Sequence, residues 1–551
     1  MIDLMENSIK TYRMIPKHVK KSFLIIFISM IGVFSFFLIN YIPGREDWGA
    51  LLERSPLFGW EIIQGRYFTN FLPFFLFDGN MGLPILNRIF SFFLLSLASV
   101  MLCMYWKLPK RTIVFSLVGL SLVLQPYILA WFFYLIGGEI FLTLPFFIMS
   151  GFFLCEKAAN FQSWHKFLLF IGAVLCFWFV LGIYPVIINT IAVVFFGRLL
   201  IDFISSKDKN LRQLISYKIP IISVITVGMS LHYVVILWLQ HKNILVNDYN
   251  SGLISMSELP FRCLLIIKTA LKYLYDYNLP FFSQFFTSMW TFLLFLSLSL
   301  SVYKFMQEKH EYNKRFFNII LMILFLFITL FVSFSTNLIS KITMFYVART
   351  DFFGIAFFHV FILTMLFKLH IHRSVIKNII FLCCISMLFF CVVQDFRAQK
   401  IWYFGFEVEK QQWMRIINRI ETTPTFEANK MYKVLILGTT LPYRPFFYTY
   451  RNTKRLVESG ELLNFPFMAS WGSSNLDPLN HYSAYGIRGK WRQIPSDWLP
   501  NEFKAAAELV KEEIFKAEPW PASSSVQIKD DIILVVLDKN DLEKTKSLVK
   551  S

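Results

Sequence analysis

Long apolar runs alternate with short polar segments along most of the chain. Eleven runs are long enough to cross a hydrocarbon core of about 30 Å. They lie at 23–40, 89–106, 112–135, 139–155, 167–183, 184–203, 219–240, 283–303, 316–334, 347–367 and 375–393. Tyr184-Pro185 divides the longest stretch into two runs, because the residue before a proline is pushed out of the helical region. The pattern predicts an α-helical polytopic membrane protein with about eleven transmembrane helices.

Lys and Arg residues concentrate in alternate loops. The segment before residue 22 and the loops at 107–111, 157–166, 207–218, 304–315 and 368–377 hold most of the basic residues of the membrane part. Basic loops stay in the cytoplasm, so we expect a cytoplasmic N-terminus and place residues 394–551 outside. The first run lacks a small-residue cleavage site, which favours an uncleaved helix over a signal peptide.

The chain changes character after residue 393. Strand-length runs lie at Met431–Leu437 and Asp531–Leu537, and helical spacing lies at Glu409–Ile420 and Glu502–Lys516. This tail has no cysteine, which suits an exported domain in an oxidising compartment. The predicted organisation is a membrane domain at 1–393, with its main outer loop at 41–88, followed by a soluble α/β domain at 394–551.

Composition supports the membrane assignment and excludes other classes. Hydrophobic residues make up 56% of the chain and charged residues 16%, against about 25% charged in soluble proteins. The net charge of +18 lies in short clusters between apolar runs, which argues against nucleic-acid binding. The seven cysteines lack metal-ligand spacing, and no nucleotide-binding fingerprint is present.

Three loops on the predicted outer side are irregular. Loop 41–88 carries five acids and four arginines, and its apolar stretch Tyr67–Phe77 is too short to span, which indicates an interfacial or re-entrant segment. In loop 241–282, the segment Cys263–Tyr275 has the pattern of a helix lying along lipid head groups. The third loop runs over 335–346.

Adjacent carboxylates follow the first apolar run directly, in the sequence Arg45-Glu46-Asp47-Trp48. A carboxylate at the outer membrane face can take a proton from an acceptor hydroxyl, and we assign this role to Asp47, with Glu46 orienting it. A solvated cluster of loop charges is the alternative reading. Two adjacent carboxylates alone do not define a metal site, so no cofactor is required, although a divalent ion held by this pair stays open.

Basic residues near the outer face are candidates for binding phosphate. An arginine fork binds phosphate in a bidentate manner, whereas snorkelling to lipid head groups is the ordinary role of a single arginine there. Arg349 has the further alternative of pairing with Asp351. The candidates are Arg66, Arg88, Lys341 and Arg349.

Other polar residues of the outer loops are candidates for binding substrate. Glu139 begins an apolar run, and an acid so close to lipid usually faces a cavity, with an interfacial position as the alternative. Tyr184 at the outer hairpin is placed to contact a sugar or belongs to the aromatic belt. The full set is Arg45, Trp48, Asp78, Glu139 and Tyr184.

The order of these features resembles the GtrII-like, serotype-converting O-antigen glucosyltransferases, which are polytopic enzymes of the GT-C type. The resemblance covers roughly residues 20–440. Glu46 stands where the family commonly has a first aspartate, and Pro185 stands where it often has glutamine. The matching elements are Glu46-Asp47, Gly65-Arg66, Asp78–Leu86, Gln125-Pro126-Tyr127, Glu139, Leu181–Tyr184 and Ala348-Arg349.

This resemblance implies a transferase of the bacterial cytoplasmic membrane that works on its outer face. It would move glucose or a related hexose from a polyprenyl-phosphate donor to a polysaccharide such as the O-antigen of lipopolysaccharide. The implied reaction is a single displacement with inversion. Asp47 would be the base, Arg66 with Arg88 or Arg349 would stabilise the departing phosphate, and no general acid is needed.

Three other functions stay open from the sequence. A transporter or flippase of lipid-linked sugars would share the helix count, but it is expected to carry charges in mid-bilayer and broken helices in paired halves. Another GT-C transferase or a polysaccharide ligase would share the chemistry. A partner-binding protein whose exported tail acts in envelope assembly is the third.

Overall fold

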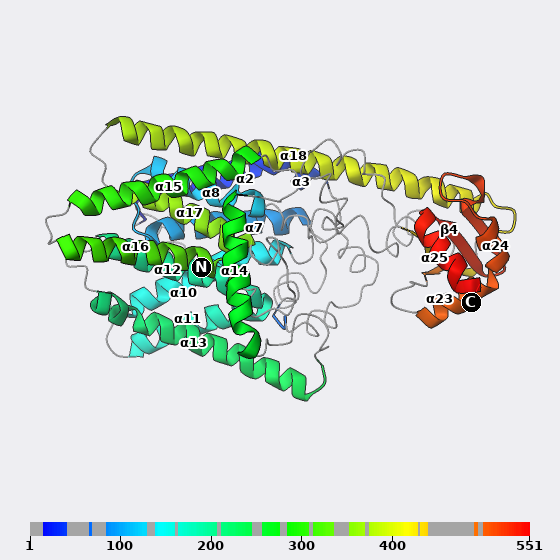
Figure 1. Cartoon of the computed structure of the whole chain (residues 1–551), viewed down its shortest axis with the longest axis horizontal. Coiled ribbons are helices and arrows are strands. Elements are labelled where there is room, and N and C mark those ends of the chain that lie inside the picture. The colour runs from blue at the N-terminus through cyan, green and yellow to red at the C-terminus, as the bar shows by residue number, and fades with distance from the viewer. Residues whose placement is uncertain are drawn as a thin grey trace, which may run out of the picture. The chain divides into compact units, whose positions relative to one another are not determined.

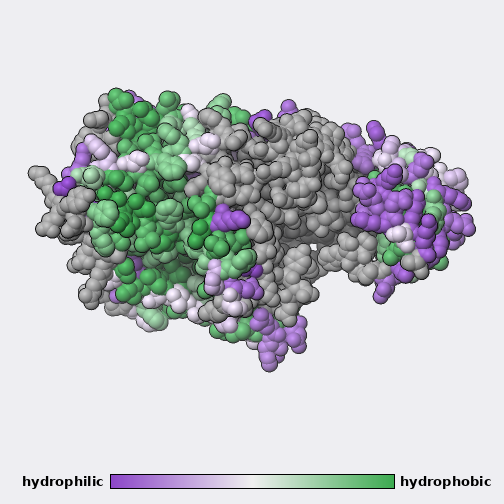
Figure 2. Space-filling model, viewed as in Figure 1, coloured by the Kyte–Doolittle hydropathy of each residue, from purple (hydrophilic) through white to green (hydrophobic). Residues whose placement is uncertain are grey.

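The computed structural model describes residues 15–40, 66–68, 84–128, 138–159, 164–205, 211–244, 256–275, 284–307, 312–335, 352–369, 374–427, 430–438, 490–493 and 500–550. Within these ranges the chain forms two compact units, one ending at Arg397 and the other beginning at Ala398. Hydrophobic side chains cover the face of the first unit seen in Figure 2, whereas hydrophilic ones dominate that of the second.

The first unit is built from helices (Figure 1). Most of them lie roughly along one direction, and α14 runs across this direction. Their bounds are α2 Lys17–Val33, α3 Ser35–Ile39, α7 Pro84–Tyr105, α8 Thr112–Val123, α10 Gly138–Ala159, α11 Trp164–Ile183, α12 Ile188–Ser205, α13 Leu211–His241, α14 Leu259–Tyr275, α15 Gln284–Gln307, α16 Tyr312–Val332, α17 Phe352–Lys368 and α18 Ser374–Glu421.

Each of the eleven predicted runs contains helix in the described part of the chain. Eight helices there are long and apolar enough to cross a membrane, and α8 and α17 are shorter apolar helices. In α13 only 17% of the most apolar window is buried, and side chains such as Val234 and Trp238 are exposed. Such an apolar surface suits lipid contact. The chain is therefore a polytopic helical membrane protein, and the count of eleven stays a prediction.

The predicted hairpin at Tyr184-Pro185 is confirmed. Helix α11 ends at Ile183, and the short 3-10 helix η1, Pro185–Ile187, leads into α12. Pro185 occupies the first position of η1, where its missing N–H removes no hydrogen bond. The turn is therefore determined locally by the sequence.

The last helix of the first unit is longer than predicted. The sequence predicted a run ending at residue 393 and a separate helix at 409–420, whereas α18 continues from Ser374 to Glu421. No proline interrupts this segment, so nothing in the backbone ends the helix where the apolar run ends. The apolar run itself ends at residue 393 as predicted, and α18 continues past it, so Asp395 is a helical residue two positions beyond the run.

The second unit contains a four-stranded sheet in the order β2-β1-β4-β3. Strand β1 pairs in parallel with β2 and β4, while β3 is antiparallel to β4. The strand predicted at Met431–Leu437 is β1, and the one predicted at Asp531–Leu537 is β4. The remaining bounds are β2 Lys490–Gln493, η6 Ser523–Ser525, β3 Val526–Lys529 and β4 Ile532–Val536.

Both faces of this sheet are covered, because alternate residues of a strand point to opposite sides. Tyr432 and Val434 of β1 pack with Trp413 and Ile420 from the end of α18. Leu435 and its neighbours on the other face pack with three further helices. These helices are α23 (Pro500–Leu509), α24 (Lys511–Lys516) and α25 (Lys539–Lys550). The single helix predicted at 502–516 is therefore divided at Val510 into α23 and α24.

Candidate functional site

The predicted site residues divide into those that the structure describes and those outside its described ranges. Side chains are described for Arg66, Arg88 and Tyr184. Glu139 lies in the first turn of α10, where only its backbone is described. The remaining seven lie outside the described residues: Arg45, Glu46, Asp47, Trp48, Asp78, Lys341 and Arg349.

Two predicted residues that are far apart in the sequence meet in the structure. The Cζ atom of Arg66 lies 5.3 Å from the ring centroid of Tyr184, which is cation–π geometry. Tyr184 is buried, and its ring also lies 4.7 Å from that of Phe141 in the first turns of α10. Arg66 itself is half-buried. Arg66, Tyr184 at the outer hairpin and Phe141 at the start of α10 therefore form one cluster.

The segment Arg66–Phe68 docks against the end of α11 through its backbone. The N–H of Phe68 donates to the carbonyl of Gly182 at 3.0 Å. A Cβ atom at Gly182 would lie 2.7 Å from Cε2 of Tyr67, closer than real Cβ contacts. Glycine at this position is what lets the segment approach the helix and places Arg66 over Tyr184.

Tyr67 fixes the same segment to α13. Its hydroxyl is hydrogen-bonded to Nδ1 of His232 at 3.0 Å, and the two rings stack 5.6 Å apart. Phe68 meets Trp178 of α11 edge-on at 4.9 Å. Burial raises the pKa of the Tyr67 phenol further above its ordinary value. The segment is therefore held by aromatic packing as well as by the backbone.

Arg88 makes a structural contact between two helices. It is 2% exposed in the first turns of α7, and its Nη1 donates to the carbonyl oxygen of Phe37 at the end of the first predicted span. Its guanidinium also lies 5.9 Å from the Phe37 ring. These contacts join α3 to α7. Arg66 is therefore the better placed of the two arginines for a ligand.

The cluster of Arg66, Tyr67, Phe141 and Tyr184 offers guanidinium donors beside aromatic faces. Guanidinium groups bind phosphate oxygens, and aromatic rings suit the apolar faces of sugars. No three His, Cys, Asp or Glu side chains gather into a metal site within the described ranges. The Glu46-Asp47 pair lies beyond them, so the divalent ion there stays a proposal.

A second polar network was missed by the sequence analysis. Gln125 at the end of α8 is hydrogen-bonded to Nδ1 of His359 in α17, and Cys391 of α18 donates to Oε1 of Gln125 at 3.8 Å. The His359 ring stacks on Trp290 of α15 with centroids 3.9 Å apart. The only sequence signal for this network was Gln125, which belongs to the motif Gln125-Pro126-Tyr127. His359 is a single histidine in the apolar run 347–367, and nothing in its sequence surroundings indicated a partner.

One comparison with known proteins gives a match. The family model described as glucosyl transferase GtrII matches residues 52–367. No curated protein and no solved structure matches the chain. The matched range includes Arg66, Glu139 and Tyr184 and begins after Arg45–Trp48.

Proposed function

The chain belongs to the GtrII glucosyltransferase family, and on this premise we propose that it transfers a hexose from a polyprenyl-phosphate donor to a cell-surface polysaccharide. Membership shows a glycosyltransferase and confirms the resemblance noted in the sequence. The lipid-linked donor, the glycan acceptor and the outer face of the cytoplasmic membrane are parts of the proposal. Glucose is the proposed sugar, and O-antigen is the proposed kind of acceptor.

The cluster of Arg66 on Tyr184 is the observation that supports this proposal best. It lies at the end of α11 and the start of α10, which the charge pattern assigns to the outside. A half-buried guanidinium at this level would meet the phosphate of a lipid carrier, whose chain lies in the bilayer. A donor anchored in this way needs no nucleotide-binding motif, which agrees with the absence of such motifs from the sequence.

The proposed reaction is one displacement at the anomeric carbon. The acceptor oxygen forms a bond to C1 as the bond from C1 to the phosphate oxygen breaks. The hydroxyl proton goes to Asp47, and the electron pair leaves with the polyprenyl phosphate. Arg66 stabilises the charge on that phosphate, and Arg349 and Lys341 are proposed to assist. Inversion at C1 follows from a single displacement.

The parts of this mechanism have unequal support. Arg66 and Tyr184 have described contacts and lie within the family match. Glu46 and Asp47 precede the matched residues, so their roles rest on the sequence resemblance and on their position after the first predicted span. Asp78, Glu139, Arg45 and Trp48 stay proposed substrate contacts.

The test is transfer by the purified protein from a synthetic polyprenyl-phosphate hexose to a short glycan, with the corresponding nucleotide sugar as the comparison donor. We expect product from the lipid donor alone, with the anomeric configuration inverted as read by NMR. A panel of hexoses in both donor forms extends the assay. Transfer from the nucleotide sugar, or retention of configuration, would contradict the proposed donor or the single displacement respectively.

A further inference from the structure

Helix α18 carries a buried polar stripe at the end of its apolar part. Cys391, Asp395 and Gln399 are spaced four residues apart and so share one side of the helix, with Gln394 beside them. All four are at most 1% exposed. The opposite side is apolar and exposed, as at Phe389 and Phe396. The stripe therefore faces protein, while the other side suits lipid.

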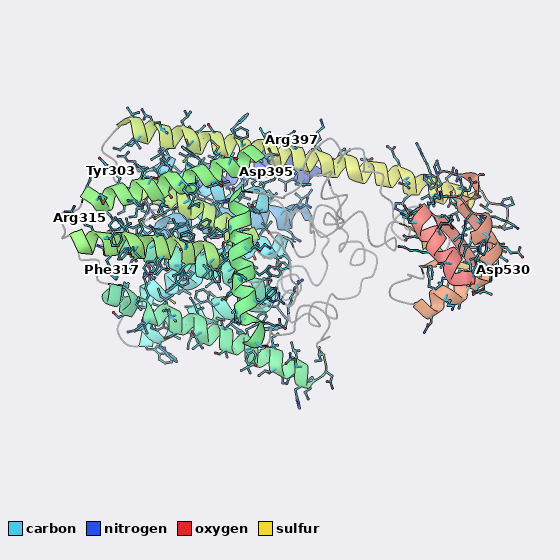
Figure 3. The ribbon with its side chains drawn as sticks, viewed as in Figure 1. Tyr303, Arg315, Phe317, Asp395, Arg397 and Asp530 are labelled. Carbon is cyan, nitrogen blue, oxygen red and sulfur yellow. The ribbon has the colours of Figure 1, made fainter. Side chains whose placement is uncertain are left out.

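Asp395 has no hydrogen-bond partner in the part of the chain that the structure describes. It is 0% exposed, and neither of its carboxylate oxygens receives a hydrogen bond there. The Oε1 atom of the adjacent Gln394 is buried without a donor as well. Arg397, labelled near it in Figure 3, is exposed on the same helix. Buried polar groups are nearly always paired, so these oxygens call for an explanation.

The unpaired oxygens lie one helical turn from the polar network of Gln125 and His359. Cys391 precedes Asp395 by four residues and donates to Gln125, which is bonded to His359. These contacts bring together the end of α8, the first half of α17 and the end of the apolar part of α18. By the alternation of the predicted spans, Gln125 and His359 lie near the middle of theirs, whereas Asp395 lies at the outer end of its span, on the side of the proposed donor.

The chemistry of these atoms defines what they bind. A carboxylate and an amide oxygen accept hydrogen bonds, so their complement is a group of O–H or N–H donors. Sugar hydroxyls are such donors. A buried carboxyl group without a hydrogen-bond partner is costly, so it is expected to have a function.

We infer that Asp395, assisted by Gln394, binds a hydroxyl group of the hexose being transferred. The inference rests on the proposed function and adds a sugar-recognition residue on α18, beyond residue 367, where the family match ends. Asp395 lies two residues past the apolar run on the same continuous helix, a level that suits the sugar of a membrane-held donor. In this assignment Arg66 meets the phosphate and Asp395 selects the sugar.

The experiment measures kcat/KM of the native protein and its variants with a series of polyprenyl-phosphate hexoses, each lacking one hydroxyl. The native protein should discriminate against one deoxy donor by about 10- to 100-fold, because the buried oxygens of Asp395 would be left without a donor. Asp395→Asn should reduce this ratio and Asp395→Leu should remove it, because asparagine keeps one of the two side-chain oxygens and leucine keeps neither. A parallel series of deoxy acceptors separates donor recognition from acceptor recognition.

Asp202→Asn is the matched control, since Asp202 is an acidic residue of α12 that lies at the other end of the first unit and has ion-pair partners there. It should lower stability and leave the discrimination ratio unchanged. Equal use of all deoxy donors by the native protein would overturn the inference without reference to any variant, even if both Asp395 variants failed to fold. An unchanged ratio in Asp395→Leu, or loss of discrimination only in the acceptor series, would also overturn it.

Two further outcomes have distinct meanings. No transfer from any lipid donor by the native protein would overturn the proposed function together with this inference. Normal transfer by the native protein with an unchanged ratio in the variants would overturn the inference alone. Transfer that depends on sodium in the native protein and loses this dependence in Asp395→Asn would assign the carboxylate to a cation and overturn sugar binding.

Discussion

Buried ionisable residues have different surroundings at the two ends of the membrane unit. At the end assigned to the cytoplasm, Asp202 lies within ion-pair distance of Arg198 at 2.8 Å, Lys218 at 3.2 Å and Lys107 at 3.4 Å. Arg198 also pairs with Glu156 at 3.1 Å. At the other end, Asp395 is wholly buried without a hydrogen-bond donor among the described residues. The inner charges hold helices together, whereas in the proposed function the outer polar groups contact the substrate.

The inner network acts as a structural joint because it connects several helices. Its members come from α10, α12, α13 and the turn after α7, and the Arg198 guanidinium lies 4.9 Å from the Tyr105 ring. Opposite charges compensate one another there, which offsets the cost of burying them. The outer clusters have a different composition, with guanidinium, aromatic and acceptor groups that complement a phosphorylated sugar. The contrast predicts that outer substitutions reduce activity, whereas inner ones reduce stability.

The largest effect is expected from Asp47→Asn. Removing a general base lowers the rate by about 10²- to 10⁴-fold, and a substitution in a predicted loop should leave the thermal midpoint unchanged. Initial rates with the lipid donor and thermal unfolding in the same detergent measure both quantities. Glu46→Gln is the neighbouring control, with a smaller expected loss. Full activity of Asp47→Asn would remove this residue from the mechanism.

Asp202→Asn should produce the largest loss of stability. The substitution removes the carboxylate that pairs with Arg198 and Lys218, which should lower the free energy of unfolding by about 3 kcal/mol. Lys107→Ala is the control within the same network, because Lys107 is 61% exposed and its pair with Asp202 is screened. Thermal unfolding in detergent should separate the two variants. Equal midpoints, or loss of transfer by a stable Asp202→Asn, would break the comparison between the two ends.

Arg66→Ala should lower kcat/KM for the lipid donor by about 10- to 100-fold, the value of a charged hydrogen bond. Arg66→Lys should recover part of this loss, since lysine keeps the charge but lacks the planar fork. Steady-state kinetics with the lipid donor provide the measurement. Arg315→Ala, at the start of α16 on the inner side, is the control arginine and should transfer normally. Equal losses at both arginines would indicate a general charge effect.

The smallest effect is expected from Gly182→Ala. The added methyl group would displace the Tyr67 ring and shift Arg66, with a strain of about 1–3 kcal/mol. We expect a several-fold rise in KM for the lipid donor. Gly32→Ala is the matched control, because a Cβ atom at Gly32 meets nothing within 4 Å. If both alanine variants have native KM values, close packing at Gly182 does not position Arg66.

The sequence predicted features that depend on local physics. Apolar runs located the helices, Pro185 located the hairpin, and a compact run of Leu, Ile and Val located β1, since each signal acts over a few residues. The contact of Arg66 with Tyr184 joins residues more than a hundred positions apart, so no local pattern contains it. The resemblance had nevertheless selected both residues.

Asp395 was missed for a related reason. In the sequence the apolar run ends at residue 393, so Asp395 was assigned to the tail. Helix α18 has no proline to end it there, and packing on its polar side buries the residue. A spacing of four residues between Cys391, Asp395 and Gln399 was the available signal, and it becomes informative only when the helix is known to continue.

The sidedness of transfer tests the account most directly. Sealed vesicles of right-side-out and inside-out orientation would carry the protein and the polyprenyl-phosphate hexose in both leaflets, with a membrane-impermeant glycan acceptor added to the medium. We predict transfer by the right-side-out vesicles alone, and by both preparations after detergent opens them. Transfer by the sealed inside-out vesicles alone would contradict the account, because it would place the reaction at the end where Asp202 and its partners hold the helices together.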